Sequence, residues 1–152
     1  MREAIGGTWL FGLVITFIVF FASFLAISVN YSRAFNVKNN VVDLISKYEG
    51  NNCKARKKIS SYLSDVGYLV PHKCDSGYTG YDLEGNDVGQ KKAYYCIYAD
   101  ETDDALAMKK KFYRVEVFFR IDLPVIGDIA TFKIKGETES IPFYKEDNLL
   151  SC

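Results

Sequence analysis

Histidine is nearly missing from this 152-residue chain, because His72 is the only one. General acid–base catalysis uses histidine more than any other side chain, so its scarcity excludes many catalytic arrangements. His72 follows a proline in a short stretch that is typical of an exposed loop. The sequence also lacks a Gly-x-Ser-x-Gly nucleophile elbow, a phosphate-binding glycine loop and a His-Glu-x-x-His zinc motif. We therefore predict that the protein is not an enzyme, and that it has no catalytic residues, no cofactor and no small-molecule substrate.

Metal-ligand spacings are also scarce. The four cysteines stand far apart and none belongs to a Cys-x-x-Cys pair, so no zinc site is predicted. Oxygen-bearing side chains alternate from Asp82 to Asp87 around Gly85, which resembles part of a calcium loop. An EF-hand needs glycine at its sixth position and glutamate at its twelfth, and this segment offers neither. We interpret it as a solvated acidic turn, with calcium binding as the alternative.

Neither sign of charge is in excess, since 19 lysines and arginines balance 19 aspartates and glutamates. A nucleic-acid-binding domain normally has a strong basic patch. The short basic runs at residues 54–58 and 109–111 are offset by an acidic run at residues 100–104. We predict no nucleic-acid partner.

What the sequence does contain is one long segment without any charge, residues 4–29. At about 1.5 Å rise per residue, a helix of this length crosses a ~30 Å hydrocarbon core with some tilt. Its polar members are hydroxyls, which can hydrogen-bond to helix carbonyls and so cost little in lipid. We predict a membrane-spanning helix over residues 1–30, in contact with the membrane through Trp9, Gly12, Thr16, Phe20, Phe24 and Val29.

Two other interpretations of this segment fit less well. The apolar part of a cleaved secretory signal is only ~7–15 residues long and precedes a small-residue cleavage site, which residues 29–33 lack. A buried core helix needs a domain large enough to enclose it, and about 120 residues remain. The segment is therefore predicted to be an anchor, followed by one domain over residues 31–152.

The four cysteines all lie outside the predicted span. An even number of well-separated cysteines is typical of disulfides in an oxidising compartment, with reduced buried thiols in a cytosolic domain as the alternative. Three pairings are possible. Cys74–Cys96 is the one we name, because Cys96 falls on a predicted strand and Cys74 in the loop that leads to it. The disulfide candidates are Cys53, Cys74, Cys96 and Cys152.

The charges that flank the predicted span do not clearly favour either orientation of the helix in the membrane.

The helical pattern continues beyond the span. Apolar residues recur at helical spacing as far as Tyr48, and polar residues occupy the opposite side. No proline or glycine interrupts residues 13–49, which predicts a single helix of about 45 residues. Gly50 is expected to end it in the left-handed conformation. A short second helix is predicted from an asparagine N-cap to Gly67, with Ala55 and Ile59 on its apolar face.

The C-terminal half has the period-two alternation of strands. Strands are predicted over residues 92–99, 112–123 and 129–141, with the last two joined as a hairpin. Residues 68–91 are interpreted as a long irregular connection, with one short strand possible near residues 68–70. One face of residues 112–123 is apolar, whereas the face with Glu116 and Phe118 is expected to meet water.

The predicted fold class is α+β, with a long N-terminal transmembrane-plus-amphipathic helix packed on an antiparallel β-meander and a short second helix. The dry face of the sheet needs a cover, and the amphipathic half of the long helix supplies one. The predicted helix–sheet interface consists of Val37, Val41, Leu44, Ile45, Val115, Val117, Phe119, Phe132 and Ile134.

Four stretches of the sequence resemble a known family. They are Arg2-Glu3-x-x-Gly6-Gly7-Thr8-Trp9-Leu10-Phe11, Asn30-Tyr31 at the end of the span, Phe119-Arg-Ile-Asp-Leu-Pro-Val-Ile-Gly127, and Lys135-Gly136-Glu137-Thr138. In these residues and in its layout, the chain resembles the TadE-like minor pilins (pseudopilins) of Tad-type pilus systems in Gram-positive bacteria, which are type IV pilin-like proteins.

The resemblance implies a single-pass structural subunit of the cytoplasmic membrane. Its C-terminal domain would lie outside, at the cell surface or in a pilus, and its partners would be other pilin-like subunits or pilus assembly proteins. Gly6 or Gly7 would mark a prepilin cleavage site, although the five residues that follow contain none of the glutamate usual in pilins. The alternative is a single-pass membrane protein whose extracytoplasmic domain binds a protein partner.

Overall fold

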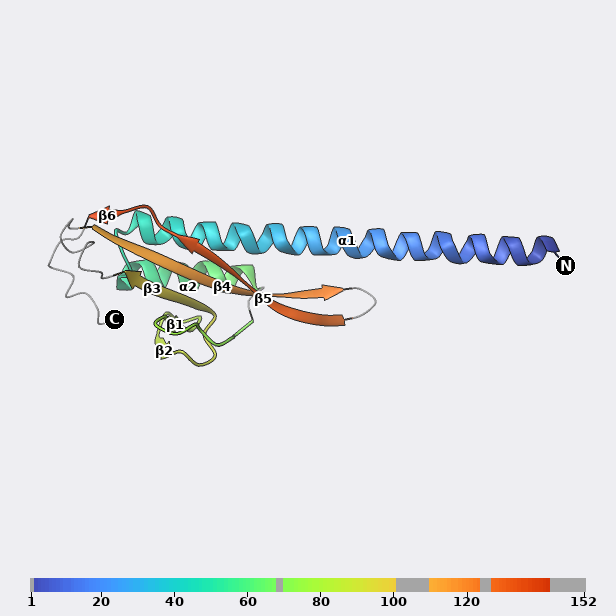
Figure 1. Cartoon of the computed structure of the whole chain (residues 1–152). Helices are drawn as coiled ribbons and strands as arrows, with labels where there is room; N and C mark the ends of the chain where they lie inside the picture. Colours follow the sequence, from blue (N-terminus) through green and yellow to red (C-terminus); the bar gives the residue numbers. More distant parts are fainter. Residues whose placement is uncertain (1, 68–69, 101–109, 124–126, 143–152) are drawn as a thin grey trace.

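One helix, α1 (Arg2–Lys47), runs without a break from the N-terminus into a small domain at its C-terminal end (Figure 1). The computed structural model describes residues 2–67, 70–100, 110–123 and 127–142. At 46 residues, α1 confirms the predicted single helix. Its first half extends far beyond the domain, and its second half lies along the sheet.

The end of α1 differs by one residue from the prediction. Glu49, not Gly50, takes the left-handed conformation, with φ 57°. The amide groups of Glu49 and Gly50 donate to the carbonyl oxygens of Ser46 and Ile45, at 3.1 and 2.9 Å. This pair of bonds is a Schellman motif, which satisfies carbonyl groups at the helix end. Gly50 has φ 140°, a conformation that residues with a Cβ rarely adopt, and a Cβ there would lie 3.0 Å from the Tyr113 hydroxyl.

The second helix, α2 (Cys53–Val66), begins and ends as predicted. The Asn52 side chain caps it by accepting a hydrogen bond from the amide of Ala55 at 2.9 Å. Gly67 is the left-handed C-cap, with φ 60°. Ile59 and Leu63 are fully buried and join the same core as α1.

The strands form one antiparallel sheet in the order β2-β1-β3-β4-β5, with β6 paired to β4. β4 (Lys110–Leu123) pairs with β3, β5 and β6, and it forms the predicted hairpin with β5 (Gly127–Glu137). The fold class is therefore α+β, as predicted. The remaining strands are short: β1 (Thr79–Tyr81), β2 (Asp87–Gly89), β3 (Tyr95–Asp100) and β6 (Ile141–Pro142).

Two strand predictions were wrong. Residues 79–81 and 87–89 form β1 and β2, although we interpreted this region as irregular. Each strand has only three residues and one of them is glycine, so neither shows a period. The strand predicted to reach residue 141 ends at Glu137, and Ile141 then pairs with Lys111 in β6.

The two faces of the sheet are covered differently. Helices α1 and α2 pack on one face around Tyr95, Val115 and Val117. Residues 72–78 cover part of the other face, next to Cys96 and Phe118. Several predicted features lie outside the described residues: the strand at residues 68–69, the turn at 124–126, Cys152, and the side chains of Ile121, Leu123 and Ala130.

Candidate functional site

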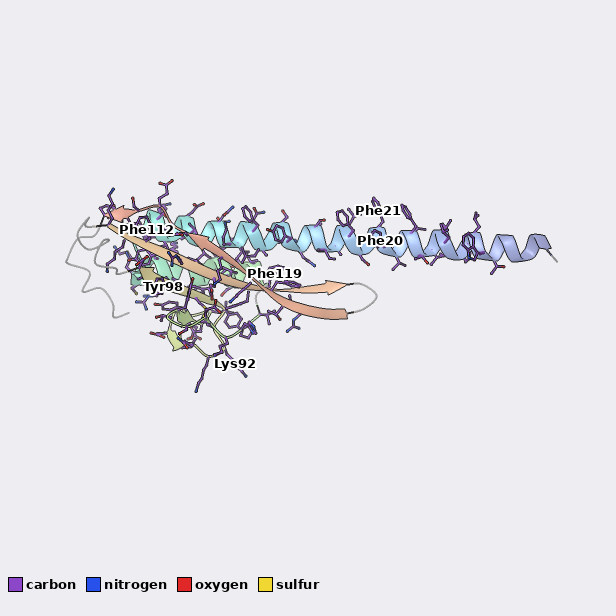
Figure 2. All side chains as sticks on the ribbon, in the orientation of Figure 1. Phe20, Phe21, Lys92, Tyr98, Phe112 and Phe119 are labelled. Atoms are coloured by element: carbon purple, nitrogen blue, oxygen red, sulfur yellow. A yellow bond between two sulfur atoms is a disulfide. The ribbon has the colours of Figure 1, made fainter. Side chains whose placement is uncertain are left out.

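The N-terminal half of α1 has no packing partner in the described part of the chain. Among the described residues, α1 is the one helix long and apolar enough to cross a membrane. No residue in its most apolar 18-residue stretch is buried. Trp9 is 73% exposed and Phe20 is 68% exposed. Figure 2 shows Phe20 and Phe21 on the part of α1 that lies past the drawn ends of β4 and β5. The residues predicted to contact the membrane are all exposed: Trp9, Gly12, Thr16, Phe20, Phe24 and Val29.

A groove runs along this bare half of α1. Thr8, Gly12 and Thr16 follow one another at intervals of four residues, and Trp9, Leu13, Phe17 and Phe20 complete the lining. The Thr16 hydroxyl donates to the carbonyl of Gly12 at 2.9 Å. Small residues at this spacing let a second apolar helix approach closely in a membrane.

Two hydroxyl groups on this half of α1, those of Thr16 and Ser23, hydrogen-bond to carbonyl groups of the helix, as predicted. Ser23 repeats the arrangement of Thr16, since its hydroxyl donates to the carbonyl of Val19 at 2.8 Å. These hydroxyls therefore reach an acceptor inside the helix, and an apolar environment does not leave them unsatisfied.

The second half of α1 is the spine of the domain. Ala34, Val37, Val41 and Ile45 are at most 2% exposed, and their spacing puts them on one side of the helix. Val37, Val41 and Ile45 share one core with Val115 and Val117 of β4, whereas Leu44 lies half-buried at the border. A second, smaller cluster joins Ala34 to Phe119, with Ala26 and Ile134 partly buried against it.

Phe132 differs from the predicted interface because it is 45% exposed. Its ring stacks on Phe119, with 5.7 Å between the ring centroids. Phe132 lies on β5, the last strand in the sheet order, so in the described part of the chain no further strand covers its outer side.

The face of the sheet that we expected to meet water is partly covered by a disulfide loop. Cys74 and Cys96 are bonded, which confirms the pairing named from the sequence. Glu116 and Phe118 are fully buried beneath this loop, contrary to prediction. Alternation along β4 could not reveal the cover, because the covering residues come from a distant part of the chain. Cys53 is disulfide-bonded as well.

The disulfide loop packs closely on β1 at Gly80. A Cβ at Gly80 would lie 2.7 Å from the Cys74 sulfur and 2.4 Å from the Ala93 Cβ. Contacts this short do not occur between real side chains, so this position requires glycine. The His72 ring lies at the edge of the cover, in an edge-to-face contact with Phe118.

Four charged side chains form a network next to the disulfide. The Lys135 ammonium lies 2.9 Å from the buried Glu116 carboxylate and 2.8 Å from the Asp75 carboxylate. Lys133 also pairs with Asp75. The hydrogen bonds from Lys133 and Lys135 lower the pKa of Asp75, and those to Asp75 and Glu116 raise the pKa of Lys135. Sequence reasoning missed this network, because Asp75 is remote in sequence from Glu116, Lys133 and Lys135.

The segment considered for calcium is a hydrogen-bonded turn. Asp82 accepts from the amides of Glu84 and Asn86, at 2.9 and 2.8 Å. Burial opposes ionisation of Asp82, but its hydrogen bonds, first those from Asn86, outweigh this and lower its pKa. Within the described residues, no three His, Cys, Asp or Glu side chains come close enough together to hold a metal ion.

Comparison of the chain with protein-family models, curated proteins and solved structures finds no match. Function is therefore inferred from the chain's own geometry. That geometry is a pilin-like architecture, in which a long N-terminal apolar helix packs by its second half on an antiparallel sheet.

Proposed function

We propose that this chain is a membrane-anchored, pilin-like structural subunit, a TadE-like minor pilin or pseudopilin of a Tad-type pilus or a related surface assembly. The observation that supports this most is the continuity of α1. One uninterrupted helix is apolar with no buried residue in its most apolar stretch, and its second half contributes one buried side to the core of the domain. A passive anchor would need no such continuity, since a flexible linker would hold a domain at a membrane equally well.

The groove of α1 supports assembly with similar subunits. In lipid, water does not drive helices together, so close packing at small residues is a main source of affinity between them. The groove centred on Gly12 offers such a surface to another apolar helix. We infer that the partners are the apolar helices of other pilin-like subunits or of pilus assembly proteins.

We further propose that the domain lies outside the cytoplasmic membrane and that α1 crosses it once. The Cys74–Cys96 disulfide supports this, because such bonds persist in oxidising compartments. Protease added to intact protoplasts should then degrade the domain. Complete protection would argue for a cytoplasmic domain. A structural role, without catalysis or cofactor, agrees with an exposed His72 that only packs against Phe118.

The test of assembly is a change in the groove. Gly12→Leu fills the groove, so it should abolish recovery of the protein with sheared surface filaments or in cross-linked oligomers. The matched control is Ala22→Leu, which adds a similar bulk at an exposed position of α1 that does not line the groove. Both variants should remain in the membrane fraction.

Two results would contradict the assembly role. One is a wild-type protein that stays monomeric in its native membrane. The other is equal assembly of the Gly12→Leu and wild-type proteins.

One observation favours the alternative, a domain that binds a protein partner. Phe132 is exposed on β5, the last strand in the sheet order, and a partner strand could pair there and cover the ring. Loss of a partner from Phe132→Ser but not from Gly12→Leu would favour this function over helix-driven assembly.

A further inference from the structure

The β4–β5 hairpin brings part of the domain to the level of the membrane surface. If the span begins at residue 4, ~20 residues of α1 fill the hydrocarbon core, and the next ~3–5 cross the headgroup layer. Ala26 then lies at headgroup depth. Because Ala26 packs against the Ala34–Phe119 cluster, Phe119 of β4 lies close to this depth as well. Figure 2 shows β4 and β5 continuing from Phe119 along α1 toward Phe20.

A polar pocket opens next to Thr131 on the face of the sheet that α1 does not cover. Its volume is about 680 Å³, and Thr131 and Lys133 of β5 line one side of it. Thr131 is the neighbour of Phe132, which pairs with Phe119, and it lies one step closer to the end of the hairpin. The rest of the lining comes from the disulfide loop and from Gln90: His72, Lys73, Cys74, Asp75 and Ser76.

Two chain segments bring further lysines to this pocket. The backbone groups of His72 and Ala93 exchange two hydrogen bonds of 2.9 Å, and the Cys74 amide donates to the Gln90 carbonyl at 3.2 Å. These bonds hold residues 72–74 against residues 90–93, so Lys91 and Lys92 lie beside Lys73. All three are exposed, and Figure 2 shows Lys92 pointing away from the body of the domain. We call Lys73, Lys91 and Lys92 the lysine rim.

The lysine rim gives the pocket a net positive charge. Inside the network, Lys133 and Lys135 are balanced by Asp75 and Glu116, so these four groups add no net charge. In the described part of the chain, no carboxylate pairs with Lys73, Lys91 or Lys92. Lys73 lines the pocket, and Lys91 and Lys92 lie beside Lys73, so three uncompensated ammonium groups gather near a pocket whose lining also offers hydroxyl and amide donors.

We propose that the lysine rim and its pocket bind the phosphate of anionic phospholipid headgroups in the leaflet from which α1 emerges. The inference rests on the proposed membrane anchoring, which sets the depth of the pocket. Lysine binds phosphate as a compact point charge, and Thr131, Ser76 and Gln90 can donate hydrogen bonds to the phosphate oxygens. Each lysine near an anionic surface strengthens binding about fivefold.

The test uses the full chain in detergent micelles, with lipid binding followed by native mass spectrometry. Phosphatidylglycerol is titrated against phosphatidylcholine, and inorganic phosphate is added as a competitor. The variant replaces the lysine rim (Lys73→Gln, Lys91→Gln, Lys92→Gln). The matched control removes the same charge from exposed positions of α2 (Lys54→Gln, Lys57→Gln, Lys58→Gln).

We expect the wild-type protein to prefer phosphatidylglycerol, the rim variant to bind it at least tenfold more weakly, and the α2 variant to bind as the wild type does. Equal binding of the two lipids, or equal weakening by the two variants, would overturn the proposal. Full competition by millimolar inorganic phosphate would also overturn it, because the site would then bind a free anion. If these results overturn it while α1 remains membrane-inserted and assembly depends on Gly12, the proposed function stands without the headgroup site.

Discussion

At the scale of single residues, Glu49 occupies a conformation that suits glycine better. Its φ of 57° brings the Cβ of any L-residue close to a carbonyl oxygen, at a cost of about 1–2 kcal/mol. The Schellman hydrogen bonds at the end of α1 keep it there, since they require a left-handed residue between Ser46 and Gly50. The turn that leads from α1 into α2 therefore holds a small, localised strain.

Glu49→Gly should relieve that strain and raise the free energy of unfolding by about 0.5–1 kcal/mol, once the greater entropy of the unfolded glycine is subtracted. Thermal unfolding of the full chain in detergent, followed by circular dichroism, measures the effect. Lys47→Gly is the control, because the same residue placed inside the last turn of α1 should lower stability by about 1 kcal/mol. A stability loss in both variants would contradict the interpretation.

Asp75 should make the domain sensitive to acid. Hydrogen bonds from Lys133 and Lys135 lower the pKa of Asp75, so the folded state favours its charged form. The resulting stability is present above the ordinary aspartate pKa of about 3.9 and is lost as the pH falls toward the lower pKa of the folded state. Unfolding temperatures measured from pH 5 to pH 2 should therefore fall more steeply for the wild type than for Asp75→Asn. Asp65→Asn, on the exposed face of α2, should keep the wild-type slope; parallel slopes for all three would argue against the role of Asp75.

At the scale of helices and strands, the regular spacing of apolar residues in the sequence predicts which side of each element is buried. The helical spacing of Val37, Val41 and Ile45 predicts the buried side of α1, and the alternation along β4 predicts Val115 and Val117 in the core. Periodicity describes one element at a time, so it cannot say what a distant loop covers. Glu116 is buried because the disulfide places residues 72–78 over it. β1 and β2 are too short to have a period.

Val41→Ala should lower the stability of the domain by about 1–4 kcal/mol, because Val41 is fully buried between α1 and the sheet and its truncation leaves a cavity. Asp43→Ala is a suitable control, since Asp43 is exposed on the same helix and should change stability by no more than about 0.5 kcal/mol. Asn40 is less suitable, because its side chain donates to the Tyr62 hydroxyl at 3.0 Å. Equal losses at positions 41 and 43 would mean that this side of α1 is not the core.

At the scale of the whole molecule, the second half of α1 belongs to the domain and the first half does not. A chain that begins at Asn30 should fold cooperatively in water, because it keeps Ala34 to Ile45 over the sheet. A chain that begins at Cys53 should aggregate, because it exposes the apolar side of β4. Size-exclusion chromatography and thermal unfolding of the two chains check this. If the shorter chain is equally soluble and cooperative, α1 is not the spine of the domain.

The unbroken path of α1 couples the distance between membrane and domain to the direction that the domain faces. Each helical residue adds about 1.5 Å of length and about 100° of rotation around the axis. One residue inserted between Phe20 and Phe24 would therefore turn the whole sheet by more than a quarter circle while lifting it by little more than a bond length. The number of residues in α1 thus fixes the direction in which the domain faces. A change of one residue would point the exposed ring of Phe132 and the lysine rim at different neighbours.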